Sequence, residues 1–125
     1  MIASCKEQLS SVPTDGDRNS LVTVVVPCYN EANRLDIDAY LRFADQMADI
    51  GLLMVNDGSH DQTLELLHCL SDQRPNSFNV FHLPKNQGKA EAVRQGVLQA
   101  SRLGARYLGY WDADLATPLE AICDL

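Results

Sequence analysis

Apolar runs of strand length alternate along this chain with segments of helical spacing, and that alternation limits the folds available to it. The first run, residues 21–26, is rich in β-branched residues and has no polar alternation, which is typical of a strand buried on both faces. Further strands are predicted at 52–55, 78–83 and 107–111, and Pro27 is expected to end the first one. Strands that alternate with helices form βαβ units, so the pattern predicts an α/β fold, a Rossmann-like three-layer αβα domain with a parallel sheet.

The segments between the predicted strands carry apolar residues three or four positions apart. Leu35, Ala39, Phe43 and Met47 mark the first predicted helix. Asp61 stands where a side chain would cap the second helix. The other apolar positions that mark helices are Leu64, Leu67, Leu70, Ala90, Val93, Val97 and Ala100, and Pro118 is expected to open a last helix.

The length of 125 residues suits one compact domain with one core. Residues 1–20 are polar, so we expect a flexible N-terminal tail followed by one domain over 21–125. No apolar run is long enough to cross a bilayer, and the start lacks the apolar core of a signal peptide. We therefore expect a cytoplasmic protein, which would reach a membrane surface through a segment beyond this chain or through its substrate.

Charge and cysteine content exclude two classes of function. The formal net charge is −7 at pH 7, which disfavours nucleic-acid binding because phosphate backbones are repelled. Acids gather in pairs such as Asp57/Asp61 and Asp112/Asp114, an arrangement that favours a cation site. The four cysteines have no CxxC spacing and no histidine cluster beside them, so we interpret them as reduced thiols and not as zinc ligands.

Polar residues follow all four predicted strands. They occupy residues 27–31, 56–61, 84–89 and 112–114. The carboxyl ends of parallel strands meet at one edge of a sheet, and ligands bind there beside a topological switch point. The sequence therefore predicts one site built from these four segments.

The segment Asp112-Ala113-Asp114 predicts a metal site. Two carboxylates one residue apart can meet one divalent ion, directly or through water, and hard oxygen ligands suit Mg²⁺ or Mn²⁺. Such an ion would bridge a diphosphate and offset the charge that develops on it as it leaves. Most isolated pairs of this kind are solvated loops, but here the pair directly follows an apolar strand, which favours the metal-binding interpretation.

The other loops offer groups for a nucleotide. Asp57 could accept a hydrogen bond from the N3–H of uracil, and Gly58 allows a tight turn or a close approach. A plain Asp-Gly turn is the alternative. Tyr29 could lie against a base or ribose, or it could be a half-buried loop aromatic. Gly88 begins a helix whose free N–H groups favour anions, and Lys89 adds a point charge for phosphate.

The order of these segments resembles that of family 2 glycosyltransferases with the GT-A fold. The resemblance runs from about residue 21 to the end of the chain and rests on residues 24–31, 55–63, 86–90 and 112–114. Within the family, residues 89–96 and 112–118 look most like the polyprenyl- or dolichyl-phosphate sugar transferases. These belong to cell-wall or lipid-linked glycan synthesis.

The resemblance implies an inverting glycosyltransferase that moves a sugar from a nucleotide-sugar to an acceptor such as a polyprenyl phosphate. Of the two common nucleotides it favours UDP over GDP. It implies that Asp112 contacts the sugar or ribose and that Asp114 binds Mg²⁺ or Mn²⁺ with the diphosphate, so that both are catalytic and metal-site residues. The nucleotide-binding residues that it implies are Pro27, Tyr29 and Glu31 along the pocket, Asp57 on the base, Gly58 and Ser59 beside it, and Lys89 near the ribose or sugar phosphate.

Members of this family continue well past their DxD motif, whereas this chain stops at Leu125. We therefore expect a truncated domain with a donor site and without an acceptor site or general base, and little or no sugar transfer by the chain alone. The fourth strand would lie at an open edge of the sheet. Open edges invite pairing, so a homodimer through that strand is a hypothesis.

Two other functions compete with this one. A nucleotidyltransferase also uses a parallel sheet and carboxylate-bound Mg²⁺, but it usually has a basic, Gly-rich loop after the first strand, where this chain has Pro-Cys-Tyr-Asn-Glu. A nucleotide-sugar-binding or receiver-like module without catalysis would keep the fold alone, and it would leave the DxD motif unexplained. Failure to bind any nucleotide would favour the module.

Overall fold

A four-stranded parallel sheet forms the centre of the computed structural model, which describes residues 22–114. The strand order is β3-β2-β1-β4. From β1 the chain adds β2 and then β3 on one side, and it then adds β4 on the other side of β1. The topological switch point therefore lies between β1 and β4. The strands are β1 (Val22–Cys28), β2 (Ile50–Asp57), β3 (Phe78–Leu83) and β4 (Tyr107–Tyr110).

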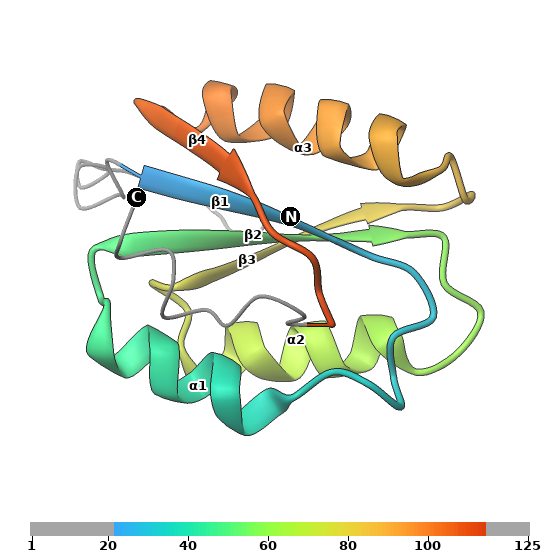
Figure 1. Ribbon diagram of the computed structural model, residues 1–125, viewed down its shortest axis with the longest axis horizontal. Helices are drawn as coiled ribbons and strands as arrows, with labels where there is room; N and C mark the ends of the chain where they lie inside the picture. The colour runs from blue at the N-terminus through green and yellow to red at the C-terminus, as the bar shows by residue number, and fades with distance from the viewer. Residues whose placement is uncertain (1–21, 115–125) are drawn as a thin grey trace.

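Helices cover both faces of the sheet and make the three layers that the sequence predicts. Figure 1 shows α1 (Ile37–Gln46) and α2 (Thr63–Gln73) on one face and α3 (Lys89–Arg102) on the other. The α/β fold class is therefore confirmed. Residues 1–20, predicted as a tail, and Pro118, predicted to open a helix, lie outside the described residues.

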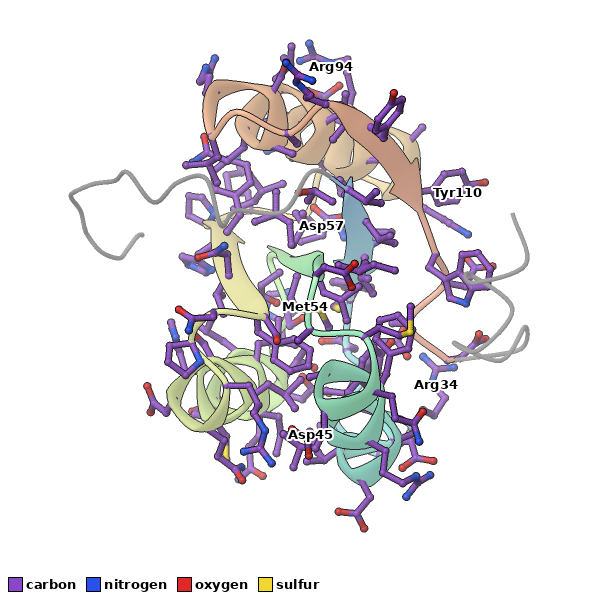
Figure 2. All side chains as sticks on the ribbon, turned by 90° about the vertical axis from the view of Figure 1, so that its left-hand side faces the viewer. Arg34, Asp45, Met54, Asp57, Arg94 and Tyr110 are labelled. Atoms are coloured by element: carbon purple, nitrogen blue, oxygen red, sulfur yellow. The ribbon has the colours of Figure 1, made fainter. Side chains whose placement is uncertain are left out.

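Successive residues of β2 point into two separate cores. Met54 packs on the side of α1 and α2, and Val55 packs on the side of α3. Because both faces are covered, every residue of β2 after Ile50 is buried, as the apolar run predicts. The same alternation turns Asp57, the last residue of the strand, toward α3, and Figure 2 shows it on that side.

Helix α3 packs on the sheet through small residues, which differ in part from the apolar positions predicted to face it. Its buried residues are Ala92, Gly96 and Ala100, while Ala90, one of the predicted positions, is exposed. A Cβ atom on Gly96 would stand 2.5 Å from Val25 Cγ1 and 2.9 Å from Val55 Cγ2. The helix therefore packs through its smallest residues, and the backbone of α3 approaches the sheet where a larger side chain would hold it off.

The expectation that Pro27 ends the first strand is wrong. β1 continues to Cys28, with Pro27 opposite Val55 in the register. Val25 accepts a hydrogen bond from Trp111 N (3.0 Å) on the β4 side, and residues two apart in a strand direct their main-chain groups to the same neighbour. The main-chain nitrogen of Pro27 therefore points to the β4 side of β1, beyond the last paired residue of β4. Although proline has no N–H to donate, no hydrogen bond between β1 and β2 is lost at this position.

Other boundaries differ by a few residues. β2 is longer than predicted because Asn56 and Asp57, although polar, stay paired with His82 and Leu83 of β3. In α2 the carboxylate of Asp61 accepts a hydrogen bond from Thr63 N (2.9 Å), so it caps the helix from one position before Gln62, the residue at the formal N-cap. β4 ends at Tyr110, one residue earlier than predicted, and its four residues are exposed.

Within residues 22–114 we find no helix that is both long and apolar enough to pass through a bilayer.

Candidate functional site

A cavity of about 290 Å³ opens at the carboxyl ends of the strands. It contains five of the residues that the family resemblance implies for nucleotide binding, together with three others. The residues that line it are Pro27, Cys28, Tyr29, Glu31, Asp57, Asn86, Gly88 and Lys89. Gly58, Ser59, Asp112 and Asp114 are not among these lining residues.

Asp57 is buried at the end of β2, with 2% of its surface exposed, and its carboxylate is turned toward the loop before α3. Oδ1 accepts a hydrogen bond from Gln87 N at 2.7 Å. Oδ2 accepts one from Gly88 N at 3.0 Å and one from Asn86 Nδ2 at 3.1 Å. Since a carboxylate has about four acceptor positions, three of the four are already occupied.

Lys89 connects this loop to the DxD segment. It is the first residue of α3, and its ammonium group donates a hydrogen bond to Asp112 Oδ1. The ammonium also lies 5.9 Å from the ring centroid of Tyr110, over its face. The hydrogen bond to Asp112 raises the pKa of Lys89, so the side chain stays cationic at neutral pH.

A tyrosine from α1 holds the DxD segment. Tyr40 is fully buried, and its hydroxyl donates a hydrogen bond to the carbonyl oxygen of Ala113 at 3.0 Å. Ala113 is itself buried, while Asp112 and Asp114 on either side of it are exposed. The two carboxylates therefore project from a segment whose centre is anchored in the core.

The loop after β1 is held against the turn after β2 and the start of α2 by hydrogen bonds from main-chain N–H groups to side-chain oxygens. Asn30 has a φ of 51°, and its side chain accepts a hydrogen bond from His60 N at 2.8 Å. The rings of Tyr29 and His60 meet edge to face at 6.5 Å between centroids.

Three consecutive main-chain N–H groups of this loop donate hydrogen bonds to side chains of the turn and of the start of α2. The bonds are Asn30 N to Ser59 Oγ (3.0 Å), Glu31 N to Thr63 Oγ1 (2.8 Å) and Ala32 N to Asp61 Oδ2 (3.2 Å).

Gly58 and Ser59, predicted as part of the base-binding wall, hold loops together in this structure. A Cβ atom on Gly58 would stand 2.3 Å from Asn86 N, and the φ of this residue is +67°. Ser59 Oγ is occupied as an acceptor by the loop after β1. Their contact with a nucleotide remains a prediction.

Glu31 brings a partly buried carboxylate to the wall of the cavity. Its Oε1 is buried and lies 3.2 Å from Arg34 Nε, at ion-pair distance but without the alignment of a hydrogen bond. Burial raises the pKa of Glu31, the charge of Arg34 lowers it, and Asp114 and Asp61 raise it, with a net upward shift. Among the described residues no group donates a hydrogen bond to Oε1, and a polar ligand could supply that donor.

Cys28 lines the cavity without being a reactive thiol. It is fully buried, and its Sγ lies 3.4 Å from the carbonyl oxygen of Val26 as a donor. Burial, and then the charge of Glu31, raise the pKa of Cys28 far above its ordinary range. A thiol that stays protonated is a poor nucleophile, so the residue serves as packing.

The acidic residues of the DxD segment suit a cation whose other ligands are waters and the phosphates of a substrate. In the part of the chain that the structure describes, no three His, Cys, Asp or Glu side chains come together as a metal site. Mg²⁺, however, usually keeps several waters and binds through one or two carboxylates together with substrate phosphates. Asp112 and Asp114 offer carboxylates of that kind, and a diphosphate would complete the set.

Sequence reasoning placed Asn86 in a segment of the site but gave it no role of its own. The Asn-Gln-Gly-Lys segment drew attention through Gly88 and Lys89, the anion-binding groups. The signal for Asn86 was its position just after a strand that neighbours β2, at the edge where Asp57 also ends. Without the strand order, that signal could not link Asn86 to Asp57.

Together these features define an α/β domain with a cavity at the carboxyl ends of its parallel strands, beside a switch point. The chain belongs to glycosyl transferase family 2, whose model matches residues 23–125. The family that the order of motifs predicts is thereby confirmed.

Curated relatives agree with this family. A poly-β-1,6-N-acetyl-D-glucosamine synthase of Staphylococcus aureus is 34% identical over 100 residues, which cover 80% of this chain and 23% of the relative. A dolichyl-phosphate β-glucosyltransferase of Dictyostelium discoideum is 33% identical over 111 residues, covering 82% of this chain and 33% of the relative. The chain thus spans about a quarter to a third of the length of these relatives.

Solved structures of GT-A glycosyltransferases share the fold. A mannosyltransferase from Pyrobaculum calidifontis, in complex with GDP-Man and Mn²⁺, matches with a TM-score of 0.65 and 23% identity, over 82% of this chain and 30% of its own. Residues 1–349 of TarS from S. aureus, in complex with UDP, match with a TM-score of 0.61 and 21% identity, over 74% of this chain and 27% of that one. The GT-A type of the α/β fold is confirmed.

Proposed function

We propose that this chain carries the donor site of an inverting glycosyltransferase, which binds a nucleotide-sugar in the cavity at the carboxyl ends of the strands. The observation that carries the proposal is the run of groups along this edge: Asp57 at one end, Lys89 in the middle and the exposed carboxylates of Asp112 and Asp114 at the other. This order suits a base, a charged diphosphate and a metal ion in turn. Relatives in complex with UDP and with GDP-Man support a nucleotide-sugar as the ligand class.

Hydrogen-bond counting favours uridine over guanosine. Three of the roughly four acceptor positions of Asp57 are taken by the loop before α3, which leaves about one. The pairing edge of uracil carries one N–H donor between two carbonyl oxygens. The edge of guanine carries two adjacent donors, which would need a free pair of acceptors. We therefore propose a UDP-sugar as the donor.

Asp114, with Asp112 beside it, would hold a Mg²⁺ or Mn²⁺ ion against the diphosphate. When bound, the ion supplies positive charge that offsets the charge of the leaving diphosphate. Lys89 adds a second cation next to Asp112, and Tyr40 keeps the acidic segment in place through Ala113. The complex of one structural relative with Mn²⁺ supports a divalent ion.

The acceptor that we propose is a polyprenyl or dolichyl phosphate. It is supported by the relative that is a dolichyl-phosphate β-glucosyltransferase, 33% identical to this chain. A lipid phosphate is itself a nucleophile, so a protein general base is less necessary. Such an acceptor would bring the reaction to a membrane surface, and we propose the cytoplasmic side.

We also propose that two copies of the chain pair through β4. In the described sheet β4 lies at the edge, bonded to β1 on one side alone. Large apolar side chains, Tyr107 and Tyr110, are exposed there.

Calorimetric titration of UDP tests the donor site. We expect UDP to bind more tightly with Mn²⁺ than without it, GDP to bind more weakly than UDP, and Asp114→Ala to abolish the gain from the metal. Asp72→Ala, an exposed acid on α2, is the matched control and should bind as the wild type does. If the folded wild type binds neither nucleotide, the proposed function is wrong and a module that keeps only the fold is favoured.

A further inference from the structure

The turn after β2 and the loop before α3 are locked to each other at the cavity. Beyond the three bonds to the Asp57 carboxylate, Asn86 Nδ2 also donates to the main-chain oxygen of Asp57 at 3.1 Å. Gly58 lets the two backbones meet, because a Cβ atom there would fall 2.5 Å from the carbonyl carbon of Lys85. We call this contact between Asp57, Gly58 and residues 85–88 the clasp.

The clasp fixes the start of α3. Gly88 is the N-cap of the helix, with a φ of 95°, and its N–H is bound by Asp57. Lys89 follows directly and directs its ammonium to Asp112, beyond the switch point. A carboxylate at the end of β2 therefore sets where a cation on α3 stands relative to the acids after β4.

We propose that Asp57 and Asn86 are positioning residues for Lys89, so that the groups beside the base also set the affinity for the diphosphate. This inference rests on the proposed function, because it assumes that a nucleoside diphosphate spans the cavity. Asn86 has no base-reading role in it. Its amide works through Asp57, by holding the 86–88 loop against the end of β2.

Comparison of uridine with UDP separates positioning from base contact. Uridine meets the base end of the cavity alone, whereas UDP reaches Lys89 as well. Loss of a base contact would weaken both ligands by the same factor. Loss of positioning would weaken UDP further than uridine, because the misplaced ammonium affects only the ligand that carries the diphosphate.

The variant to test is Asn86→Ala. Asn86 is exposed and lies in a loop, so its truncation leaves the cores intact, whereas a change at buried Asp57 could unfold the chain. We expect UDP affinity to fall about fivefold to tenfold and uridine affinity to fall less than about twofold, the size expected for loss of a hydrogen bond that organises a charged contact. Asn76→Ala is the matched control, because Asn76 is an exposed asparagine in the turn before β3 and outside the clasp, and it should leave both affinities unchanged.

A double-mutant cycle with Lys89→Ala completes the test. In the Lys89→Ala background, Asn86→Ala should lower the affinity for UDP by no more than it lowers the affinity for uridine. The reason is that the cation which Asn86 positions is already gone. In ligand-free protein, Asn86→Ala should also shift the amide NMR signals of Gly88 and Lys89, which report the start of α3.

The outcomes separate the two proposals. Equal losses for uridine and UDP on Asn86→Ala, with wild-type UDP binding intact, would overturn the positioning role and leave the donor site standing. Unshifted Gly88 and Lys89 signals would overturn it as well. If the wild type binds neither uridine nor UDP, the proposed function fails, and the positioning of Lys89 for a diphosphate fails with it.

Discussion

At the scale of the residue, the geometry of the candidate site depends on side chains that are buried in the core. Tyr40 is the clearest case, because its ring lies in the core under α1 while its hydroxyl reaches the main chain of the DxD segment. Burial raises the pKa of Tyr40 well above its ordinary range, so the hydroxyl remains a donor at every working pH. The orientation of two exposed carboxylates is thus controlled from inside the protein.

Tyr40→Phe tests that control. The change removes the hydrogen bond from the hydroxyl of Tyr40 to the buried carbonyl of Ala113, so we expect a loss of about 1–2 kcal/mol in the free energy of unfolding. We also expect the affinity gain of UDP from Mn²⁺ to shrink, with uridine affinity unchanged, as measured by calorimetry. Tyr107→Phe, at an exposed ring, is the control and should alter neither quantity. An unchanged metal effect in Tyr40→Phe would show that the segment needs no anchor.

Gly58→Ala should be strongly destabilising for two reasons that add. The backbone at φ +67° is unfavourable for an L side chain, and the new Cβ would lie 2.3 Å from Asn86 N. Strain of 1–2 kcal/mol plus overpacking of similar size predicts a loss of about 3 kcal/mol in urea denaturation. Gly104→Ala is the control, because Gly104 also has a positive φ, +95°, but open space around it. Equal losses at the two positions would mean that the clasp tolerates the extra atom.

At the scale of the element, the sequence predicts strands and site better than it predicts contacts between loops. The four strands and three of the helices follow from apolar runs and helical spacing, which are local. Pro27 could not be placed inside β1 from the sequence, because its tolerance depends on where β4 ends. Likewise the role of Ser59 depends on a loop 29 residues earlier in the chain, and no local pattern contains that pairing.

Asp61 joins two such elements, and its removal should loosen both. Burial alone would raise the pKa of Asp61, but hydrogen bonds from Thr63 and Ala32 lower it on balance below its ordinary value of 3.8. Asp61→Asn keeps an acceptor for Thr63 but presents an N–H to Ala32, so we expect a loss of about 1 kcal/mol at pH 7, the size of one lost hydrogen bond. Urea denaturation of both proteins checks this.

The pH dependence of that loss has a definite sign. A carboxylate whose pKa is lowered on folding stabilises the protein above its unfolded pKa, and this stabilisation disappears as pH falls through the folded value. The difference between the wild type and Asp61→Asn should therefore be constant from pH 7 down to about 5 and shrink below pH 3.8. Asp72→Asn, at an exposed acid on α2 whose carboxylate makes no hydrogen bond among the described residues, removes one negative charge and is the control at pH 7. If the two proteins still differ in free energy of unfolding by the same amount at pH 2, the charge of Asp61 does not contribute to stability.

At the scale of the whole molecule, the two edges of the sheet differ in character. The β3 edge carries polar Asn79 and His82 on exposed positions, as edges that avoid pairing commonly do. The β4 edge carries Tyr107, Leu108 and Tyr110, all exposed, and Figure 2 shows Tyr110 pointing away from the sheet. In the described part of the chain, then, the β3 edge has the polar character that opposes pairing with another strand, whereas the β4 edge has an apolar surface that favours it.

Self-association through β4 should follow from this asymmetry. We expect light scattering to give a mass that rises with concentration from the 13.8 kDa of one chain toward twice that value. Leu108→Lys should hold the protein at the monomer mass, because a charge at an open edge has to be desolvated when a second strand pairs with it. Asn79→Lys adds the same charge at the opposite edge and should leave the association unchanged. A wild-type mass that stays at one chain over the whole concentration range would exclude the dimer, and the apolar edge of β4 would then need a different occupant.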